Sequence, residues 1–557
     1  MTSFFPNPLQ AFAQHEQERP NAVFLTQSWH GQYQDITWQQ AGRMARRLAC
    51  YLQQQGLEPG ARVAIMSKNS AYWVISDLAI WMAGMVSVPL YPSLTAQSVR
   101  PILEHSEVQA VIYGQLDVPG VRAGIPDSVL TIATPLCLDA SGCTTWEQAM
   151  QSPELAAQEQ APEQLATIMY TSGTTGLPKG AMHSFGNMAT AASSYSAQSG
   201  LSKNDVIFSY LPMSHVGERL AVELTSLYCG SRIFFNESLD SFISDLRTCK
   251  PDVFLGVPRI WLKLFQAMRA FADAELIAEL DSGCEPTDAE AQRILTSVGL
   301  EKARFGVCGA APVPPSLLTW YNRLGLPMIE VYGMTENFGY SHLGQVGITP
   351  AGWVGPSLPG VEVRLTPEGE VAVNSPANML GYYKDEAKSA EVFTKDGYFL
   401  TGDKGEINEQ GLIRIVGRVR DTFKTSKGKF VAPAPIENAL ASSPWVEHVL
   451  VLGQGLPAPV ALIVPPQQLL NQPDDALLTQ LETLRLKVNT TLERHEQISH
   501  VLVIAEQWSV ASGELTPTLK AKRDVLERRY AEALEQLIER APGAHYATSL
   551  TALLPAE

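Results

Sequence analysis

Apolar and polar residues follow one another along the first half of the chain with two different periods. Apolar positions recur at helical spacing in three segments, which predicts helices at residues 39–55, 70–84 and 98–105. Short apolar runs lie between them and predict strands at residues 62–67, 85–90 and 108–113. This alternation favours parallel sheets covered by helices, whose ligands bind beyond the carboxyl ends of the strands.

The second half of the chain changes character twice. Residues 261–302 are largely helical in pattern, and residues 361–373 alternate like two strands joined by a turn. A smaller unit begins beyond residues 417–421, with strands predicted at 448–452, 460–464 and 500–505 and helices at 476–497 and 522–540. We therefore predict an α/β protein. Its parts are a large N-terminal domain of helix-covered, mostly parallel sheets (1–417), a hinge (418–421) and a smaller α+β domain (422–557).

Bulk composition narrows the class of protein. The 557 residues are 45% hydrophobic and 18% charged, which is typical of a globular enzyme with two or more domains. The net charge of −16 argues against a nucleic-acid partner. Anionic ligands therefore need local basic groups and backbone donors.

The cysteines and the N-terminal residues indicate in which cellular compartment the protein is located. Seven scattered cysteines without Cys-x-x-Cys spacing indicate a reducing compartment and no zinc site. Residues 1–20 lack the pattern of a signal peptide. The apolar stretch 72–90 fits a buried helix and strand better than a membrane span. We therefore expect a cytoplasmic protein.

Residues 170–182 are the most informative segment and read Tyr-Thr-Ser-Gly-Thr-Thr-Gly-Leu-Pro-Lys-Gly-Ala-Met. Hydroxyl residues and glycine fill positions 171–176, and such loops form anion-binding concavities of backbone N–H groups. Lys179 adds a positive charge. The segment is not a P-loop, because Leu177 and Pro178 precede that lysine. It predicts a polyphosphate site, and the competing interpretation is a plain flexible loop.

This loop resembles the phosphate-binding signature of the adenylate-forming enzymes, which include acyl-CoA synthetases, luciferases and peptide-synthetase adenylation domains. Further motifs in the family's order extend the resemblance over most of the chain. The resemblance implies the fold of that family, in which the smaller C-terminal domain is mobile. It also implies that the nucleotide is held by Thr171, Ser172, Gly173, Thr174, Thr175, Gly176 and Lys179.

A second motif, Tyr332-Gly333-Met334-Thr335-Glu336, follows an apolar run at residues 328–331. Hydroxyl and carboxylate groups at a strand end suit a phosphate oxygen and Mg²⁺, which prefers oxygen ligands. The resemblance implies that Tyr332, Gly333 and Thr335 contact the nucleotide and that Glu336 and Thr171 hold Mg²⁺. Taken alone, the pentapeptide is also typical of an ordinary turn.

Three other segments extend the predicted nucleotide and CoA site. Gly309, Ala310 and Ala311 resemble the family's adenine-side turn, although any tight turn has this composition. Asp403 ends a predicted strand, where a carboxylate can accept hydrogen bonds from the ribose hydroxyls, or it is simply an exposed turn residue. By resemblance, Arg418 also contacts the ribose. A basic loop is similar to the one that contacts CoA in the family, or is simply solvated; it contains Lys424, Lys427, Gly428 and Lys429. Arg420 occupies the family's hinge position, where aspartate or lysine is usual.

The segment Leu515-Thr516-Pro517-Thr518-Leu519-Lys520 resembles the one that carries the family's catalytic lysine. Leu519 stands where glycine is more widespread, so Lys522 stays an alternative to Lys520. In residues 211–219 the resemblance places His215 over the acyl carboxylate, and a structural histidine is the other interpretation. The predicted catalytic residues are Lys520, Thr335, His215 and Lys179.

Residues 211–219, 257–261 and 515–523 resemble the long-chain acyl-CoA synthetase branch. The resemblance implies a ligase for a long- or medium-chain fatty acid that uses ATP, Mg²⁺ and coenzyme A. Two alternatives stay open: an enzyme that adenylates an aromatic acid or serves a carrier protein, and a non-catalytic nucleotide-binding scaffold. Transient peripheral contact with membranes and a homodimer also stay open.

Overall fold

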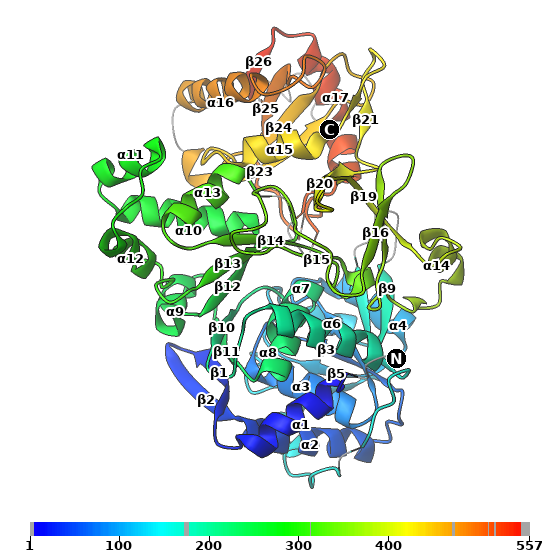
Figure 1. Ribbon diagram of the computed structural model, residues 1–557. Coiled ribbons are helices and arrows are strands. Elements are labelled where there is room, and N and C mark those ends of the chain that lie inside the picture. The colour runs from blue at the N-terminus through cyan, green and yellow to red at the C-terminus, as the bar shows by residue number, and fades with distance from the viewer. Residues whose placement is uncertain are drawn as a thin grey trace. The chain divides into compact units, whose positions relative to one another are not determined.

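The structure is a computed structural model that describes residues 5–156, 158–171, 178–311, 313–470, 474–510, 512–516 and 520–546. The chain divides into two compact units (Figure 1). The first comprises residues 1–311, 315–363 and 373–400, and the second comprises residues 312–314, 364–372 and 401–557. The second unit therefore begins ahead of the hinge predicted at residues 418–421, which stays a prediction.

The first unit contains two large sheets. The first sheet has the strand order β15 (His342–Leu343), β14 (Met328–Tyr332), β13 (Phe305–Cys308), β12 (Val253–Gly256), β10 (Val206–Ser209), β11 (Arg232–Phe235), β1 (Val23–Trp29) and β2 (Gln32–Thr37). Neighbouring strands from β14 to β1 pair in parallel, while β15 and β2 are antiparallel edge strands.

The second sheet continues the α/β pattern. Its strand order is β18 (Gly381–Tyr382), β9 (Lys179–Ser184), β8 (Leu165–Thr171), β4 (Val86–Leu90), β3 (Arg62–Met66), β5 (Val108–Tyr113), β6 (Leu130–Ala133) and β7 (Thr144–Thr145). Strands β8 to β7 pair in parallel, and β9 and β18 are antiparallel additions. The prediction of mostly parallel, helix-covered sheets is confirmed.

Helix α3 (Ala71–Met82) explains why residues 72–90 are so apolar. The helix contacts β1 of one sheet and β3 and β4 of the other, and residues 71–81 are all buried. Ser70 begins it by accepting a hydrogen bond from the Trp73 N–H. A helix enclosed by two sheets needs apolar residues on every side. In the part of the chain that the structure describes, no helix is long and apolar enough to cross a membrane.

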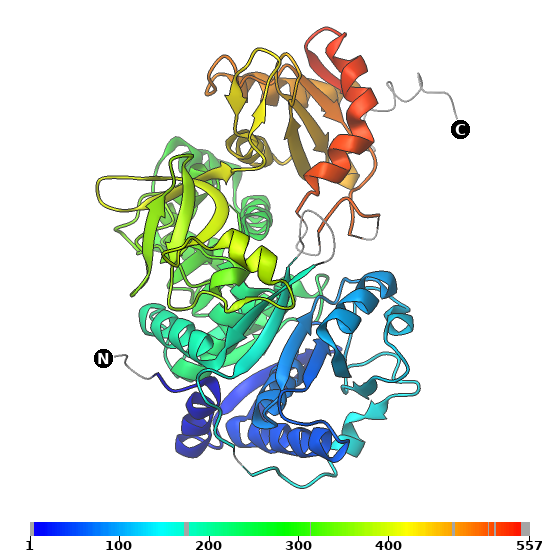
Figure 2. The same cartoon turned by 90° about the vertical axis from the view of Figure 1, so that its right-hand side faces the viewer.

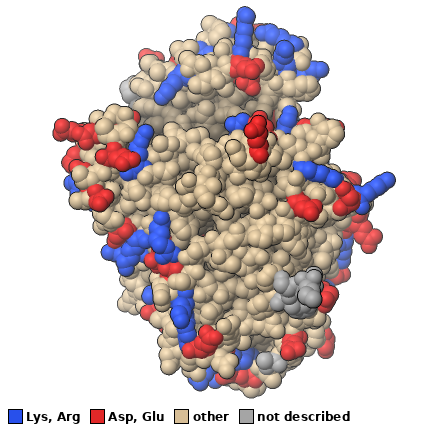
Figure 3. Space-filling model, in the orientation of Figure 1, with Lys and Arg blue, Asp and Glu red and all other residues tan. Residues whose placement is uncertain are grey.

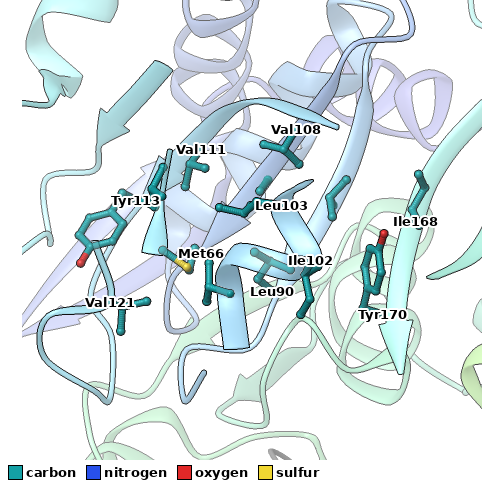
Figure 4. Close-up of a cluster of buried hydrophobic side chains, with 14 of the residues drawn as sticks. Met66, Leu90, Ile102, Leu103, Val108, Val111, Tyr113, Val121, Ile168 and Tyr170 are labelled. Carbon is teal, nitrogen blue, oxygen red and sulfur yellow. The ribbon is translucent and has the colours of Figure 1, made fainter. Parts of the chain in front are cut away.

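Helix α4 (Ala96–Ser106) packs on strands β3, β4 and β5 of the second sheet. Its residues Ile102 and Leu103 are buried with Met66, Leu90 and Val108, and Figure 4 shows these side chains gathered between the helix and the strands. Other helices of the first unit are α1 (Pro8–Glu18), α2 (Trp38–Gln54), α6 (Phe185–Gln198), α7 (Val216–Glu218), the π-helix η2 (Arg219–Leu224), α8 (Thr225–Cys229) and α9 (Phe242–Cys249).

The helical stretch expected at residues 261–302 consists of separate helices. They are α10 (Pro258–Phe271), α11 (Ala274–Ser282) and α12 (Asp288–Thr296), and α13 (Pro315–Arg323) follows β13. Gly283 ends α11 with a φ of +102°, a conformation that glycine adopts without strain.

In the second unit, a four-stranded sheet accounts for the apolar runs near the C-terminus. Its order is β23 (His448–Leu452), β24 (Val460–Val464), β25 (His500–Val503) and β26 (Gly543–Tyr546), and only β23 is antiparallel to its neighbour. Successive side chains point to opposite faces. One face packs on α15 (Pro433–Ala441) and α16 (Asp474–Asn489), and the other on α17 (Arg523–Ile538) (Figure 2).

The helix predicted at residues 476–497 is shorter than expected. It begins at Asp474 and ends at Asn489. The Asn489 side chain donates to the Ile498 carbonyl at 2.9 Å and accepts from the Ile498 N–H at 2.8 Å, which draws the chain into a loop. An asparagine side chain that bonds the backbone in this way competes with the helix.

Surface charge is mixed. On the face drawn in Figure 3, lysine and arginine side chains lie interspersed with aspartate and glutamate, and uncharged residues cover most of the area. On this face the acidic residues therefore do not collect in one patch.

Candidate active site

The carboxyl ends of three parallel strands of the first sheet define the candidate site in the first unit; β13 and β14 are neighbours, and β12 lies between β13 and β10. Chain segments leave β10, β13 and β14 at this edge of the first sheet and carry Tyr210, Gly309 and Gly333 respectively. The edge of a parallel sheet from which strands deliver loops is where α/β proteins bind ligands. Two of the motifs that predicted nucleotide binding, at residues 309–311 and 332–336, thus begin at one sheet edge.

The glycine-rich loop connects β8 to β9, which pair as an antiparallel hairpin. Thr171 lies opposite Lys179 in this pairing, at the loop end of the hairpin. Both predicted residues are therefore placed where the loop leaves the sheet. The predicted loop residues Ser172, Gly173, Thr174, Thr175 and Gly176 lie outside the described residues.

Lys179 and Glu336 converge on one tyrosine. The Lys179 ammonium lies 5.4 Å from the centroid of the Tyr382 ring. The Tyr382 hydroxyl donates a hydrogen bond of 2.9 Å to Glu336 Oε1. Burial and the adjacent Glu336 carboxylate raise the pKa of Tyr382, so the phenol keeps its proton and remains a donor. Two residues predicted from separate motifs are thus brought to the same side chain.

A buried histidine ties the same hairpin to the second motif. His183 of β9 donates from Nε2 to the carbonyl of Thr335 at 2.8 Å and packs its ring edge-on against Phe338. Burial lowers the pKa of His183 to about 3, so the ring is neutral and its tautomer is set by the carbonyl acceptor. The sequence analysis did not identify His183. Its position four residues after Lys179, on the strand that follows the glycine-rich loop, could have marked it as a candidate.

The turn that carries Thr335 and Glu336 requires glycine at position 333. A Cβ atom on Gly333 would lie 2.4 Å from the Gly339 carbonyl oxygen, which is closer than side chains allow. The Gly339 N–H in turn bonds the Met334 carbonyl at 2.8 Å. The segment therefore folds back on itself and holds the short 3₁₀ helix η3 (Thr335–Asn337) beside Tyr332 at the strand end.

The predicted adenine-side turn contains a backbone outlier. Ala310 has a φ of +67°, a left-handed conformation that costs a residue with a side chain on the order of 1–3 kcal/mol. The preceding Gly309 packs so closely on Val331 that a Cβ atom would lie 2.6 Å from Val331 Cγ2. Ala310 and Ala311 are exposed. Strain of this kind concentrates at ligand sites, which agrees with the predicted role of the turn.

The residues fit a bound Mg²⁺ ion. Tyr382 holds one oxygen of the Glu336 carboxylate, and no described residue donates a hydrogen bond to the other oxygen. Within the described ranges there is no cluster of three or more histidine, cysteine, aspartate or glutamate side chains suited to a metal. Mg²⁺ commonly binds through one or two carboxylates together with nucleotide phosphates, so a single carboxylate at this place suffices.

His215 lies at the same sheet edge, on the segment between β10 and α7. Its Nδ1 accepts a hydrogen bond of 3.1 Å from the Gly217 N–H, which fixes the ring plane at the start of the helix. Asn69 and Glu218 hold the segment that leads to it: Asn69 accepts from the Met213 N–H at 2.9 Å, and Glu218 Oε1 accepts from the Tyr210 N–H at 3.0 Å. His215 therefore stands on a rigid support.

The buried carboxyl group of Glu218 should make the free energy of unfolding depend on pH. Burial raises the pKa of Glu218 to about 8 in the folded protein, against 4.5 for an ordinary glutamate. Between these values the unfolded chain ionises while the folded protein keeps its proton. Stability therefore falls with rising pH in that window, by about 1.4 kcal/mol per pH unit for this group.

The variant Glu218→Gln removes that proton equilibrium while keeping an oxygen acceptor for Tyr210. As pH rises from 5 to 8, we expect the free energy of unfolding of the variant to increase relative to that of the unmodified protein. Urea titrations of both proteins at several pH values measure this difference. A difference that stays constant across the window would show that Glu218 is ionised in the folded state.

In the second unit the structure brings three further predicted residues together. Asp403 pairs with Arg418 at 2.9 Å between β19 (Phe399–Ile407) and β20 (Ile413–Arg418), and Asp403 is buried. Lys520 lies within electrostatic reach of both groups. Loss of water contact lowers the pKa of Lys520, Arg418 lowers it further and Asp403 opposes the shift, although part of the lysine's surface stays exposed.

Two hydrogen bonds join Lys520 to Thr516. The Thr516 N–H donates to the Lys520 carbonyl at 2.8 Å, and the Lys520 N–H donates to Thr516 Oγ1 at 3.1 Å. Residues 517–519 lie outside the described residues. Lys520 lies within electrostatic reach of Asp403 and Arg418, and its role as the adenylation lysine, with Lys522 as the alternative, stays a prediction.

The predicted CoA-contacting loop is a small ribbon. It joins β21 (Phe423–Lys424) to β22 (Phe430–Val431), turns at Gly428 with a φ of +77°, and places the Lys424 ammonium 5.4 Å from the Phe430 ring centroid. Lys424, Lys427 and Lys429 are all exposed. An exposed basic ribbon can receive an anionic ligand, so the CoA role stays a prediction.

Comparison with protein families gives two matches that together span most of the chain. Residues 12–383 match the family described as AMP-binding enzyme. Residues 420–542 match the family described as AMP-binding enzyme C-terminal domain.

Two similar curated proteins carry the same kind of name. "Long-chain-fatty-acid--CoA ligase FadD15" of Mycobacterium bovis is 28% identical over 578 residues, covering 94% of this chain and 96% of the relative. "Long-chain-fatty-acid--CoA ligase 1" of Homo sapiens is 29% identical over 580 residues, covering 91% of this chain and 82% of the relative.

Solved structures share the fold. The adenylation domain of a carboxylate reductase from Mycobacterium chelonae superimposes with a TM-score of 0.79 at 22% identity, covering 97% of this chain and 92% of that one. The anthranilate CoA ligase AuaEII, solved with anthranoyl-AMP, gives a TM-score of 0.78 at 21% identity, covering 96% of this chain and 99% of that one. These likenesses confirm the predicted adenylate-forming fold.

Proposed function

We propose, from the premise that this chain belongs to the AMP-binding enzyme family, that it is an ATP-dependent long-chain fatty acid–CoA ligase. The observation that carries the proposal is the near end-to-end similarity to relatives named as long-chain-fatty-acid–CoA ligases, which cover 91–94% of the chain. The sequence motifs of that branch and the sheet-edge site support it.

The proposed reaction has two steps. First, an oxygen of the fatty acid carboxylate bonds to the α-phosphorus of ATP, and the bond from that phosphorus to the pyrophosphate oxygen breaks. Second, the sulfur of CoA bonds to the acyl carbon, the bond to AMP breaks, and the thiol proton leaves to solvent. Neither step needs a protein nucleophile, so the residues act by positioning and by electrostatics.

We propose the following roles from the family resemblance, supported by the positions of the described residues. Lys179 and the backbone donors of its loop hold the β- and γ-phosphates, Thr335 contacts the α-phosphate, and Glu336 and Thr171 ligate Mg²⁺, which offsets the phosphate charge. Asp403 and Arg418 hold the ribose. Lys520 approaches the α-phosphate in the first step, His215 covers the acyl carboxylate, and the basic ribbon with Lys424, Lys427 and Lys429 receives CoA. The turn with Gly309, Ala310 and Ala311 faces the adenine.

The two steps need different groups near one acyl-adenylate. A C-terminal unit that moves about residues 418–421 between the steps meets this need. We also propose a cytoplasmic location, with fatty acid, ATP and CoA as the small-molecule partners.

The deciding experiment is a mass-spectrometric assay of the purified protein with ATP, Mg²⁺ and saturated fatty acids from short to long, with and without CoA. We expect acyl-CoA and AMP in equal amounts, with most product from a long-chain acid. Acyl-AMP that accumulates and ignores CoA would assign another acceptor, such as a carrier protein. AMP formed only with aromatic acids would replace the fatty acid as substrate.

A further inference from the structure

We propose that Tyr382 is a positioning residue of the nucleotide site, which orients the Glu336 carboxylate through its hydroxyl and supports the Lys179 ammonium on its ring. The inference rests on the proposed function, in which Glu336 ligates Mg²⁺ and Lys179 binds phosphate. It adds a side chain that lies outside every motif used to predict the site.

The backbone of Tyr382 is fixed by the strand that carries Lys179. Strand β18 pairs with β9, with Tyr382 opposite Ala181. The Tyr383 N–H donates to the Gly180 carbonyl at 2.8 Å, and the Tyr382 N–H donates to Ser389 Oγ at 2.8 Å. Tyr382 therefore holds a defined position relative to β9, the strand that begins with Lys179.

The same segment holds Glu336 at two points. The Met379 N–H donates to the Glu336 carbonyl at 2.7 Å, and the Tyr382 hydroxyl donates to Glu336 Oε1 at 2.9 Å. One bond fixes the backbone of Glu336 and the other fixes its carboxylate. Glu336 thus presents Oε2 in one orientation, as a pre-oriented metal ligand requires.

Burial strengthens the arrangement. Tyr382 is 6% exposed and packs in a small core with Ala181, Met379 and Phe399. Its ring has few alternative rotamers in that core, and a hydrogen bond to a carboxylate is stronger where water is excluded. The Lys179 ammonium, 5.4 Å from the ring centroid, gains a cation–π contact from the same side chain.

The neighbouring residue supplies a matched control. The Tyr383 hydroxyl donates to Glu107 Oε2 at 3.0 Å, and the Lys384 ammonium lies 5.2 Å from the Tyr383 ring. The chemistry of tyrosine, glutamate and lysine is repeated, but Glu107 and Lys384 are exposed and belong to no predicted motif. Removing this second hydroxyl tests the general effect of losing a tyrosine–glutamate hydrogen bond.

The experiment compares Tyr382→Phe, Tyr383→Phe, Glu336→Gln and the double variant Tyr382→Phe/Glu336→Gln. Binding of Mn²⁺, as a probe for Mg²⁺, is measured by electron paramagnetic resonance in the presence of ATP. Rates of acyl-AMP formation are measured alongside as KM for MgATP and kcat. Circular dichroism melts establish that each variant is folded.

We expect Tyr382→Phe to weaken Mn²⁺ binding in the ATP complex by about tenfold, as outer-shell partners of metal ligands do. KM for MgATP should rise by a similar factor. Tyr383→Phe should match the unmodified protein within about twofold, the usual scatter of such measurements. In the Glu336→Gln background the Tyr382→Phe change should add no further loss, because the hydroxyl acts through the carboxylate.

Two results would overturn the inference: unchanged Mn²⁺ binding in Tyr382→Phe, or an equal loss in the presence and absence of the Glu336 carboxylate. A failure of the proposed metal site would instead be seen in the Glu336→Gln variant. If Glu336→Gln binds Mn²⁺ and ATP normally, the metal role of Glu336 is wrong, and the hydrogen bond between Tyr382 and Glu336 is then only structural.

The contact with Lys179 is tested separately by binding of metal-free ATP in EDTA. Tyr382→Phe keeps the ring and should leave this affinity unchanged, whereas Tyr382→Leu removes the ring and should weaken it severalfold, as loss of a cation–π contact does. Equal affinities for the two variants would refute the support of Lys179 by the ring.

Discussion

Lys520→Ala is expected to lose acyl-AMP formation by about 100- to 1000-fold, the range seen when one charged or polar group that stabilises a transition state is removed. The loss should appear in kcat. In the structure Lys520 lies within electrostatic reach of Asp403 and Arg418, where the ribose is proposed to bind. Thioester formation from supplied acyl-AMP should persist, since the second step attacks the acyl carbon and breaks its bond to the phosphate oxygen, whereas only the first step attacks the α-phosphorus. Pyrophosphate release and acyl-CoA formation measure the two steps separately.

The matched control is Lys522→Ala, which removes a lysine close in sequence whose N–H bonds the Glu514 carbonyl at 2.8 Å. Adenylation should survive this change. If Lys522→Ala instead loses adenylation and Lys520→Ala keeps it, the assignment of the two lysines is reversed. Equal loss of both steps in Lys520→Ala would indicate that the lysine supports the fold rather than the first step.

Arg219→Met is expected to destabilise the first unit by about 3–5 kcal/mol, because it leaves a buried carboxylate without its partner. Arg219 begins the π-helix η2 and contacts Asp77 directly, and Glu223 lies 3.5 Å away; all three side chains have no exposed surface. Thr167 Oγ1 accepts a further bond from Arg219 at 2.7 Å. Urea unfolding followed by circular dichroism measures the loss.

The arrangement contains two carboxyl groups for one guanidinium. Burial and the charge of Asp77 raise the pKa of Glu223, and since Arg219 contacts Asp77 more closely, we assign the proton to Glu223. The double variant Arg219→Met/Asp77→Leu removes the unpaired charge and should recover much of the lost stability.

An exposed pair provides the comparison. Arg293 and Asp273 lie 2.7 Å apart with side chains 48% and 73% exposed, so Arg293→Met should cost less than about 1 kcal/mol. A similar small cost for Arg219→Met, or no recovery in the double variant, would contradict the account of a buried charge pair.

Local patterns were enough to predict most elements of the fold. The helix expected at residues 39–55 is α2, and the strands expected at residues 448–452 and 460–464 are β23 and β24 within the bounds predicted. Each of these rests on a period of apolar residues that the segment carries by itself. The end of α16 was missed because Asn489 bonds Ile498, a contact that helical periodicity does not contain.

The predicted site likewise depends partly on local sequence and partly on tertiary contacts. The sequence by itself determined the chemistry available, since hydroxyl, glycine, lysine and carboxylate residues stand in the order of a nucleotide-binding family. Glycine at position 333 is also a local requirement of the turn.

Only the tertiary structure decided which of these groups meet. Tyr382 reaches Glu336 and Lys179 because β18 pairs with β9 in one register, and a shift by one residue would turn the ring to the other face of the sheet. Lys520 lies within electrostatic reach of Asp403 and Arg418, although both are distant from it along the chain. Composition and spacing carry no record of strand register or of packing between distant segments. The sequence therefore determined the class of ligand, and the fold decided the partners of each charged group.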